Sequence, residues 1–178
     1  SPVQPDSVGK PNLSPADLRD TDMWGATPFD QLLCRIQFHQ YRYQGQFTPP
    51  AEGISIAYPA FDGVIDWYGA SVDPLHHVLI ANTSYIPFTM QIMKSEEAIQ
   101  KGLMKNWAGW GSGQAYPKPK EFAVGPQYGT PWAAIVKPWL GMLDAPCNAP
   151  PWGKLYAIDL LSKKIIWERP AGTTRDMN

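Results

Sequence analysis

Residues 153–167 read GKLYAIDLLSKKIIW and predict a two-stranded hairpin. Apolar residues alternate on either side of a short polar turn, and successive side chains of a strand point to opposite faces. Four apolar side chains can share one face of this hairpin: Leu155, Ala157, Ile165 and Trp167. Asp159 ends the first strand, where its carboxylate can accept N–H groups of the turn. The hairpin therefore presents Trp167 as a large flat element for packing against a neighbouring sheet.

The composition favours short strands joined by many turns. The chain has 178 residues, with 19 Pro, 15 Gly and 8 Trp. Pro and Gly interrupt regular structure, which argues against a helical bundle. Alternating or apolar runs predict strands near residues 36–43, 54–59, 64–72, 77–82, 131–136, 153–159 and 163–168. We therefore predict an all-β fold.

Two segments depart from this strand pattern. Residues 1–22 are rich in Pro, Asp and Ser and predict an irregular arm. Within residues 89–120 the apolar residues are separated by charges, and residues 95–98 read SEEA, with acids in the first turn of a helix. We predict a helical insertion and loop over residues 89–120. Residues 29–35 can form a short helical turn before the strand at 36–43.

The charge balance excludes several classes of protein. There are 15 basic and 16 acidic residues, a net charge of −1, and no basic run. A surface that tracks nucleic-acid phosphates is therefore not expected. The sequence contains neither a run of about eighteen apolar residues, as a membrane-spanning helix requires, nor a signal peptide.

The two cysteines leave two interpretations open. Cys34 and Cys147 are far apart and form no C-x-x-C pair, so a zinc or redox motif is not supported. In an oxidising compartment they can form a disulfide. Otherwise they are two small buried apolar side chains.

Three further stretches, read in order with the hairpin, resemble one family. They are MWGATPFDQLLCR at residues 23–35, DWYGASVDP and LIAN within 66–82, and PQYGTPW and APCNAPPWG within 126–153. The hairpin is similar to the tryptophan-docking pattern A-x-D-x-x-T-G-K-x-x-W, with Ser162 for Thr and Lys163 for Gly. Together they resemble the membrane-bound glucose/quinate/shikimate dehydrogenases that use pyrroloquinoline quinone (PQQ).

The resemblance implies that residues 23–178 form part of an eight-bladed β-propeller, about two blades with the insertion at 89–120. It also implies an internal piece of a longer protein that carries a membrane anchor. In such a blade Trp167 is expected to be mostly buried, and an exposed ring would count against the blade interpretation.

Asn82 is the principal candidate for cofactor binding. It follows the apolar run VLIA, at the expected end of a strand. The resemblance implies that this Asn contacts the quinone end of PQQ. An amide suits that place because its NH₂ group donates to a quinone oxygen without placing a charge beside it. Without the resemblance, the residue is more typical of an Asn that binds turn backbone.

Four residues are candidates for lining the pocket: Asp66, Trp67, Gln127 and Trp132. The Asp66–Trp67 pair resembles the family's acid–Trp pair near the substrate mouth, although Tyr68 replaces a Gly of the W-G-G pattern. A packing role is the simpler interpretation of this pair, and the same alternative applies to Gln127 and Trp132.

The resemblance places the catalytic base upstream and the Ca²⁺ or Mg²⁺ ligands outside this segment, so no catalytic or metal-binding residue is predicted in it. His76 and His77 are adjacent on a predicted strand and would point to opposite faces, which disfavours a metal site. Asp30 and Arg35 are two charges in an apolar stretch and are expected to form an ion pair.

Two functions follow from these features. The first is a segment of a dehydrogenase at the periplasmic face of the inner membrane, which oxidises a sugar or cyclic polyol with PQQ and reduces ubiquinone. The second is a non-catalytic propeller module that binds or assembles other proteins. The stretches around Cys34 and Cys147 argue against this module, because simple blade repeats would not need them. The separate segment is expected to be inactive, because the other blades complete the pocket, and to self-associate through exposed sheet edges.

Overall fold

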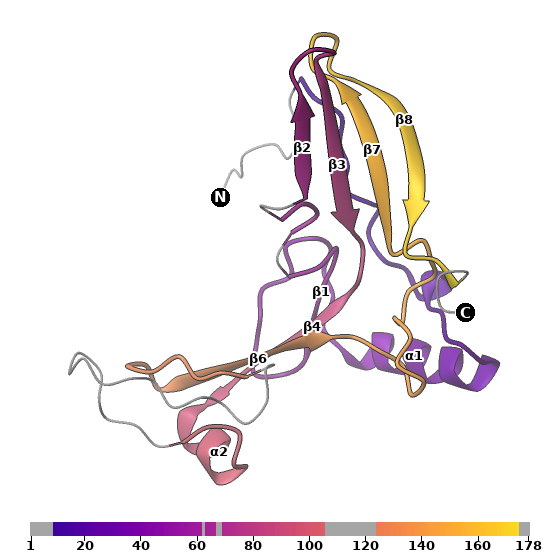
Figure 1. Cartoon of the computed structure of the whole chain (residues 1–178). Coiled ribbons are helices and arrows are strands. Elements are labelled where there is room, and N and C mark those ends of the chain that lie inside the picture. Colours follow the sequence, from indigo (N-terminus) through magenta and orange to yellow (C-terminus); the bar gives the residue numbers. More distant parts are fainter. Residues whose placement is uncertain (1–8, 62, 67–68, 106–123, 175–178) are drawn as a thin grey trace.

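The computed structural model describes residues 9–61, 63–66, 69–105 and 124–174. Within these residues the chain forms two four-stranded antiparallel sheets (Figure 1). The first, here called the hairpin sheet, has the order β2 (Ala70–Asp73), β3 (Val78–Ser84), β7 (Gly153–Asp159), β8 (Lys164–Ala171). The second, the insert sheet, has the order β1 (Ser55–Ala57), β4 (Phe88–Lys94), β6 (Trp132–Pro138), β5 (Val124–Gly125).

The helices of the described residues are short. They are the 3₁₀ turn η1 (Asp20–Asp22), α1 (Pro28–Gln40) and α2 (Ser95–Gln100). α2 lies at the far end of the insert sheet and α1 near the junction of the two sheets (Figure 1). None of the helices in the described part of the chain is long and apolar enough to cross a membrane.

The hairpin sheet follows the chain order of its strands, but a long excursion separates β3 from β7. β3 leads directly into β4, which carries the chain into the insert sheet (Figure 1). The chain returns at Gly153, which pairs with Ser84, and β7 then runs antiparallel to the whole of β3. The insert sheet is therefore built mostly within the loop between two neighbouring strands of the hairpin sheet.

Asp159 closes the β7–β8 turn, as predicted. Its carboxylate accepts the backbone N–H of Leu161 at 3.0 Å and bonds the hydroxyl and N–H of Ser162. These donors, the Ser162 hydroxyl first, hold the pKa of Asp159 below its usual value. The turn is thus fixed by side-chain acceptance of backbone donors, as Asp does in tight turns.

The main core lies at the junction of the sheets. Its buried side chains are Leu18, Met23, Cys34, Ile56, Tyr58, Tyr85, Trp139 and Cys147. Cys34 and Cys147 form a disulfide with a Cα–Cα distance of 5.4 Å, which settles the question that the sequence left open. The bond joins α1 to the segment that returns the chain to β7.

A buried carboxylate supports the same connection. Asp30 is 1% exposed, and it accepts backbone N–H groups of Ala26 at 3.1 Å and Met142 at 2.7 Å. The prediction of an ion pair with Arg35 is wrong, because the Arg35 Nε donates to the carbonyl of Asp20 instead. A spacing of five residues places the two side chains about 140° apart around a helix, so they point in different directions.

The strand predicted at residues 36–43 is also wrong, since α1 continues to Gln40. The Thr27 side chain accepts the N–H of Asp30 and Pro28 occupies the first turn, which are strong signals for a helix start. Cys34 and Phe38 are four residues apart and therefore share a face, and the Phe38 ring stacks on Trp139. This helical spacing outweighed the short alternation seen in the sequence.

The predicted insertion at 89–120 is only partly helical. Ser95–Gln100 forms α2, as expected, but Phe88–Lys94 forms the strand β4. The alternating Phe88, Met90 and Ile92 carried a strand signal that the interspersed polar residues obscured. Of the strand predicted at 64–72, the described residues form β2 at Ala70–Asp73, and residues 67–68 lie outside the described residues. Residues 106–123 of the insertion also lie outside them.

Trp167 is not buried, which contradicts the prediction. A bulge in the β7–β8 ladder places it opposite Ala157, whereas Ile165 lies opposite Ile158. The side chain is 41% exposed and its neighbour Leu155 is 38% exposed. A docking Trp becomes buried when a second sheet packs on its face, and no such sheet covers this face within the described residues.

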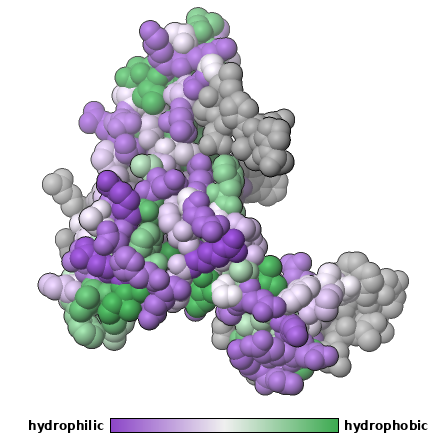
Figure 2. Space-filling view, turned by 180° about the vertical axis from the view of Figure 1, so that it is seen from behind, coloured by the Kyte–Doolittle hydropathy of each residue, from purple (hydrophilic) through white to green (hydrophobic). Residues whose placement is uncertain are grey.

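A second apolar surface lies on α1 and the loop that Asp30 holds. Figure 2 shows apolar side chains gathered at this end of the molecule. The exposed members are Phe29, Leu32, Ile36, Met142 and Leu143.

Removing the disulfide should destabilise the fold strongly. It closes a sequence separation of 113 residues, for which the loss of the cross-link costs about 4 kcal/mol. We expect Cys34→Ala combined with Cys147→Ala to lower the free energy of unfolding in urea by about this amount. The unmodified chain with added reductant is the matched control and should lose similar stability. An unchanged urea midpoint in both cases would contradict a structural role for the bond.

The open face around Trp167 should drive self-association. We expect light scattering to show species larger than the 19.8 kDa chain, because exposed sheet edges and apolar faces pair readily. Trp167→Arg should reduce the association, whereas Leu161→Arg, a change in the exposed β7–β8 turn, should not. A concentration-independent monomer of the unmodified chain would refute this prediction.

Candidate functional site

Asn82 lies on the exposed face of the hairpin sheet. Its neighbours in β3, Ala81 and Thr83, are 0% and 3% exposed, so the alternation of the strand turns Asn82 outward. It lies inside β3, which continues to Ser84, and not at the strand end that the sequence suggested. It is opposite Leu155, so it shares the open face that also carries Trp167.

The backbone of Asn82 is held, but its side chain is not. The N–H donates to the carbonyl of Gly69 at 2.6 Å. Among the described residues the side-chain amide has no hydrogen-bond partner, so it does not satisfy turn backbone as the alternative interpretation required. The amide therefore remains available as a donor and an acceptor.

Asp66 and Asn82 line the same hollow of about 210 Å³. Its other lining residues are Gly63, Val64, Gly69, Thr83 and Ser84. The N–H of Gly69 donates to the carbonyl of Asp66 at 2.7 Å, which holds Asp66 close to the β2–β3 edge. Trp67, the other member of the predicted pair, lies outside the described residues.

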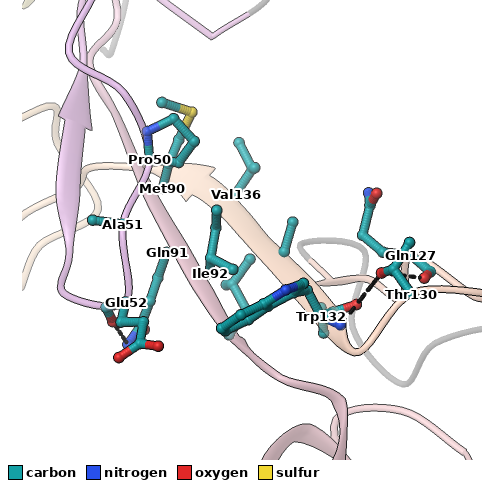
Figure 3. A pocket seen from close by; sticks show the side chains of 13 residues that line it. Pro50, Ala51, Glu52, Met90, Gln91, Ile92, Gln127, Thr130, Trp132 and Val136 are labelled. Atoms are coloured by element: carbon teal, nitrogen blue, oxygen red, sulfur yellow. Dashed lines mark hydrogen bonds between the residues drawn. The ribbon is translucent and has the colours of Figure 1, made fainter.

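Gln127 and Trp132 lie elsewhere, along an apolar trough of about 540 Å³ on the insert sheet. The trough lies on the face of the sheet opposite α2, whose residues pack against Met93 and Ala133. Figure 3 shows Gln127 and Trp132 on the β6 side of the trough and the segment around Ala51 on the other side. The three predicted pocket-lining residues that the structure describes, Asp66, Gln127 and Trp132, therefore do not share one pocket.

The described residues contain no group of three or more His, Cys, Asp or Glu side chains that could hold a metal ion. His76 follows β2 in a turn, and its Nδ1 lies 2.7 Å from the Asp73 carboxylate. The hydrogen bond from His76, together with backbone N–H groups of the turn, keeps the pKa of Asp73 low. His76 therefore stabilises a turn at the surface through its contact with Asp73.

The comparison with protein families decides the identity of the fold. The family model of the PQQ-dependent glucose/ethanol/alcohol dehydrogenase β-propeller domain matches residues 1–178. The chain belongs to this family. The all-β, partial-propeller prediction is therefore confirmed by the family match. The exposure of Trp167, which we expected to count against a blade, was thus a wrong criterion for this chain.

Individual relatives are similar over nearly the whole chain. It is 39% identical to the quinoprotein glucose dehydrogenase of Escherichia coli (strain K12) over 90% of its length, which is 19% of that protein. It is 38% identical to the probable quinate dehydrogenase (quinone) of Xanthomonas campestris pv. juglandis over 99% of its length, 21% of that protein. It is 40% identical to the glycerol dehydrogenase large subunit of Gluconobacter oxydans (strain 621H) over 98% of its length, which is 24% of that protein. The propeller chain thus spans about a fifth to a quarter of these relatives.

The Asn82 hollow fits one edge of PQQ in its chemistry. An outward amide without an internal partner can donate to a quinone oxygen, and apart from Val64 the other lining residues are small or polar. Sequence reasoning missed Gly69, whose backbone links Asp66 to Asn82. Its only sequence signal was a glycine directly before a strand, which often marks a close backbone approach.

Proposed function

We propose that the chain is a segment of a quinoprotein dehydrogenase that oxidises a sugar or cyclic polyol with PQQ and reduces ubiquinone. The family match over residues 1–178 carries this proposal. The names of these relatives include glucose, quinate and glycerol dehydrogenases, and the name of the Xanthomonas protein includes the word quinone. Glucose, quinate and glycerol each carry several hydroxyl groups, so we propose a polyhydroxylated compound as the substrate.

Asn82 is the residue of this segment that would hold the cofactor. Its Nδ2 group would donate to a quinone oxygen, and the hydrogen bond from its N–H to Gly69 keeps the strand backbone in place. Bound PQQ supplies a two-electron acceptor for hydride from the substrate carbon. Asp66 would lie beside the cofactor edge as a second polar wall of the hollow.

The remainder of the site would come from other blades of the longer protein. A Ca²⁺ or Mg²⁺ ion that polarises the quinone needs several oxygen ligands, and we propose that these and the catalytic base lie outside this segment. A propeller pocket is assembled around a central channel by all of its blades. The separate chain is therefore proposed to be inactive.

The disulfide supports a location outside the cytoplasm. Structural disulfides persist in oxidising compartments such as the bacterial periplasm, and Cys34 and Cys147 form one here. We therefore propose the periplasmic face of the inner membrane, where ubiquinone is within reach of the longer protein's anchor.

Reconstitution of the full-length protein with PQQ tests the function. We expect oxidation of glucose, quinate or glycerol with a ubiquinone analogue, dependent on added PQQ and Ca²⁺ or Mg²⁺. The same preparation without PQQ is the control. Normal folding with saturating PQQ but no oxidation of any of these substrates would favour the non-catalytic propeller module instead.

Substitution of Asn82 tests the cofactor contact. In the full-length protein, Asn82→Ala should weaken PQQ binding or turnover about tenfold to a hundredfold, because one lost hydrogen bond costs about 1–3 kcal/mol. The side chain is exposed and has no internal partner, so the melting temperature of the PQQ-free protein should change little.

Gln40→Ala, which removes an exposed amide at the end of α1, is the matched control and should bind PQQ normally. If Asn82→Ala instead lowers the melting temperature of the PQQ-free protein and leaves PQQ affinity and turnover intact, Asn82 is a structural residue.

A further inference from the structure

Gly69 connects the two polar residues of the hollow through its backbone. It lies directly before β2, at the edge of the hairpin sheet. Its carbonyl accepts the N–H of Asn82 at 2.6 Å, and its N–H donates to the carbonyl of Asp66 at 2.7 Å. One residue therefore sets how the Asp66 segment lies against the strand that carries Asn82.

The packing around Gly69 leaves no room for a side chain. A Cβ atom at this position would lie 2.9 Å from Cγ2 of Ile65 and 3.0 Å from the carbonyl oxygens of Asn82 and Asp66. All three separations are shorter than ordinary contacts of carbon with carbon or oxygen. The close approach of two backbones here favours glycine, and a larger residue would force its neighbours to shift.

We propose that Gly69 is a positioning residue for the cofactor site: the absence of a Cβ allows the Asp66 segment to close against Asn82 and form the hollow that receives the quinone edge. This inference rests on the proposed function, in which Asn82 donates to PQQ. Gly69 does not touch the cofactor in this proposal, and it acts only through the placement of Asn82 and Asp66.

The surrounding hydrogen bonds indicate which part would move after substitution. β3 is paired along its whole length with β7, from Val78 to Ser84, so the backbone that carries Asn82 is held from that side. Gly69 precedes β2 at the edge of the sheet, and among the described strands β2 pairs with β3 alone. A methyl group at Gly69 would therefore push the Asp66 segment away and lengthen the bond between Gly69 and Asn82.

The test uses the full-length dehydrogenase prepared without PQQ and titrated with PQQ by absorbance. We expect Gly69→Ala to weaken PQQ binding about threefold to tenfold, because the site is displaced and not removed. Gly53→Ala is the matched control, since a Cβ there meets nothing within 4 Å, and it should bind PQQ normally.

A double-mutant cycle separates positioning from a general structural effect. If Gly69 acts through Asn82, Gly69→Ala should cause little further loss of PQQ affinity when Asn82→Ala is already present. Fully additive losses, or normal PQQ affinity in Gly69→Ala, would overturn the inference. Normal PQQ affinity in Asn82→Ala alone would instead overturn the cofactor contact on which the proposed function depends.

A second variant background keeps the test decisive if Gly69→Ala alone does not fold. Ile65→Ala removes the methyl group that makes the shortest contact with the added Cβ. The cycle is repeated in this background if Gly69→Ala alone lacks the circular dichroism spectrum of the parent. The carbonyl contacts remain at 3.0 Å, so the dependence on Asn82 should persist, and its absence would again overturn the inference.

Discussion

The pairing of β3 with β7 is the constraint on which the other parts of the chain depend. Ser84 and Gly153 are opposite each other although 68 residues lie between them. A Cβ at Gly153 would collide with the carbonyl of Thr83, so the two strands meet closely where the excursion leaves and returns. The insert sheet has to form within a loop whose two ends are held together, and its position follows from that closure.

The return of the chain to β7 is secured by polar contacts inside the core. Asn148 donates from Nδ2 to the carbonyl of Tyr85, and Trp152 donates from Nε1 to the carbonyl of Asn148. The hydroxyl groups of Tyr85 and Tyr156 lie 2.9 Å apart. Burial raises the pKa of the nearby Tyr58 to about 12, so its hydroxyl stays neutral over the physiological range. The disulfide and the Asp30 contacts hold the outer side of the same segment, and together they connect both sheets to one core.

The candidate cofactor residue lies on a face that this core does not cover. Asn82, Leu155 and Trp167 share an open surface of the hairpin sheet. A strand that alternates buried and exposed side chains can place an amide outward without any loss of internal packing. The same face is the one on which a further sheet of a propeller would pack, so the site and the inter-blade contact are neighbours. The apolar trough of Gln127 and Trp132 belongs to the other sheet and is a separate feature.

Local sequence was sufficient for features that depend on neighbouring residues. The β7–β8 hairpin, the turn acceptor Asp159, the start of α2 at Ser95 and the family followed from patterns of a few residues. Such features are set by alternation, turn chemistry and capping, which act over one or two turns of chain.

Contacts between distant segments could not be read in this way. α1 became a helix because its cap and its packing on Trp139 outweighed a short alternation, and the pairing of Cys34 with Cys147 depends on where the chain returns to β7. Gly69 gained its role only from the backbone of a neighbouring strand. Trp167 stayed exposed because burial needs a covering surface, and one hairpin does not supply it.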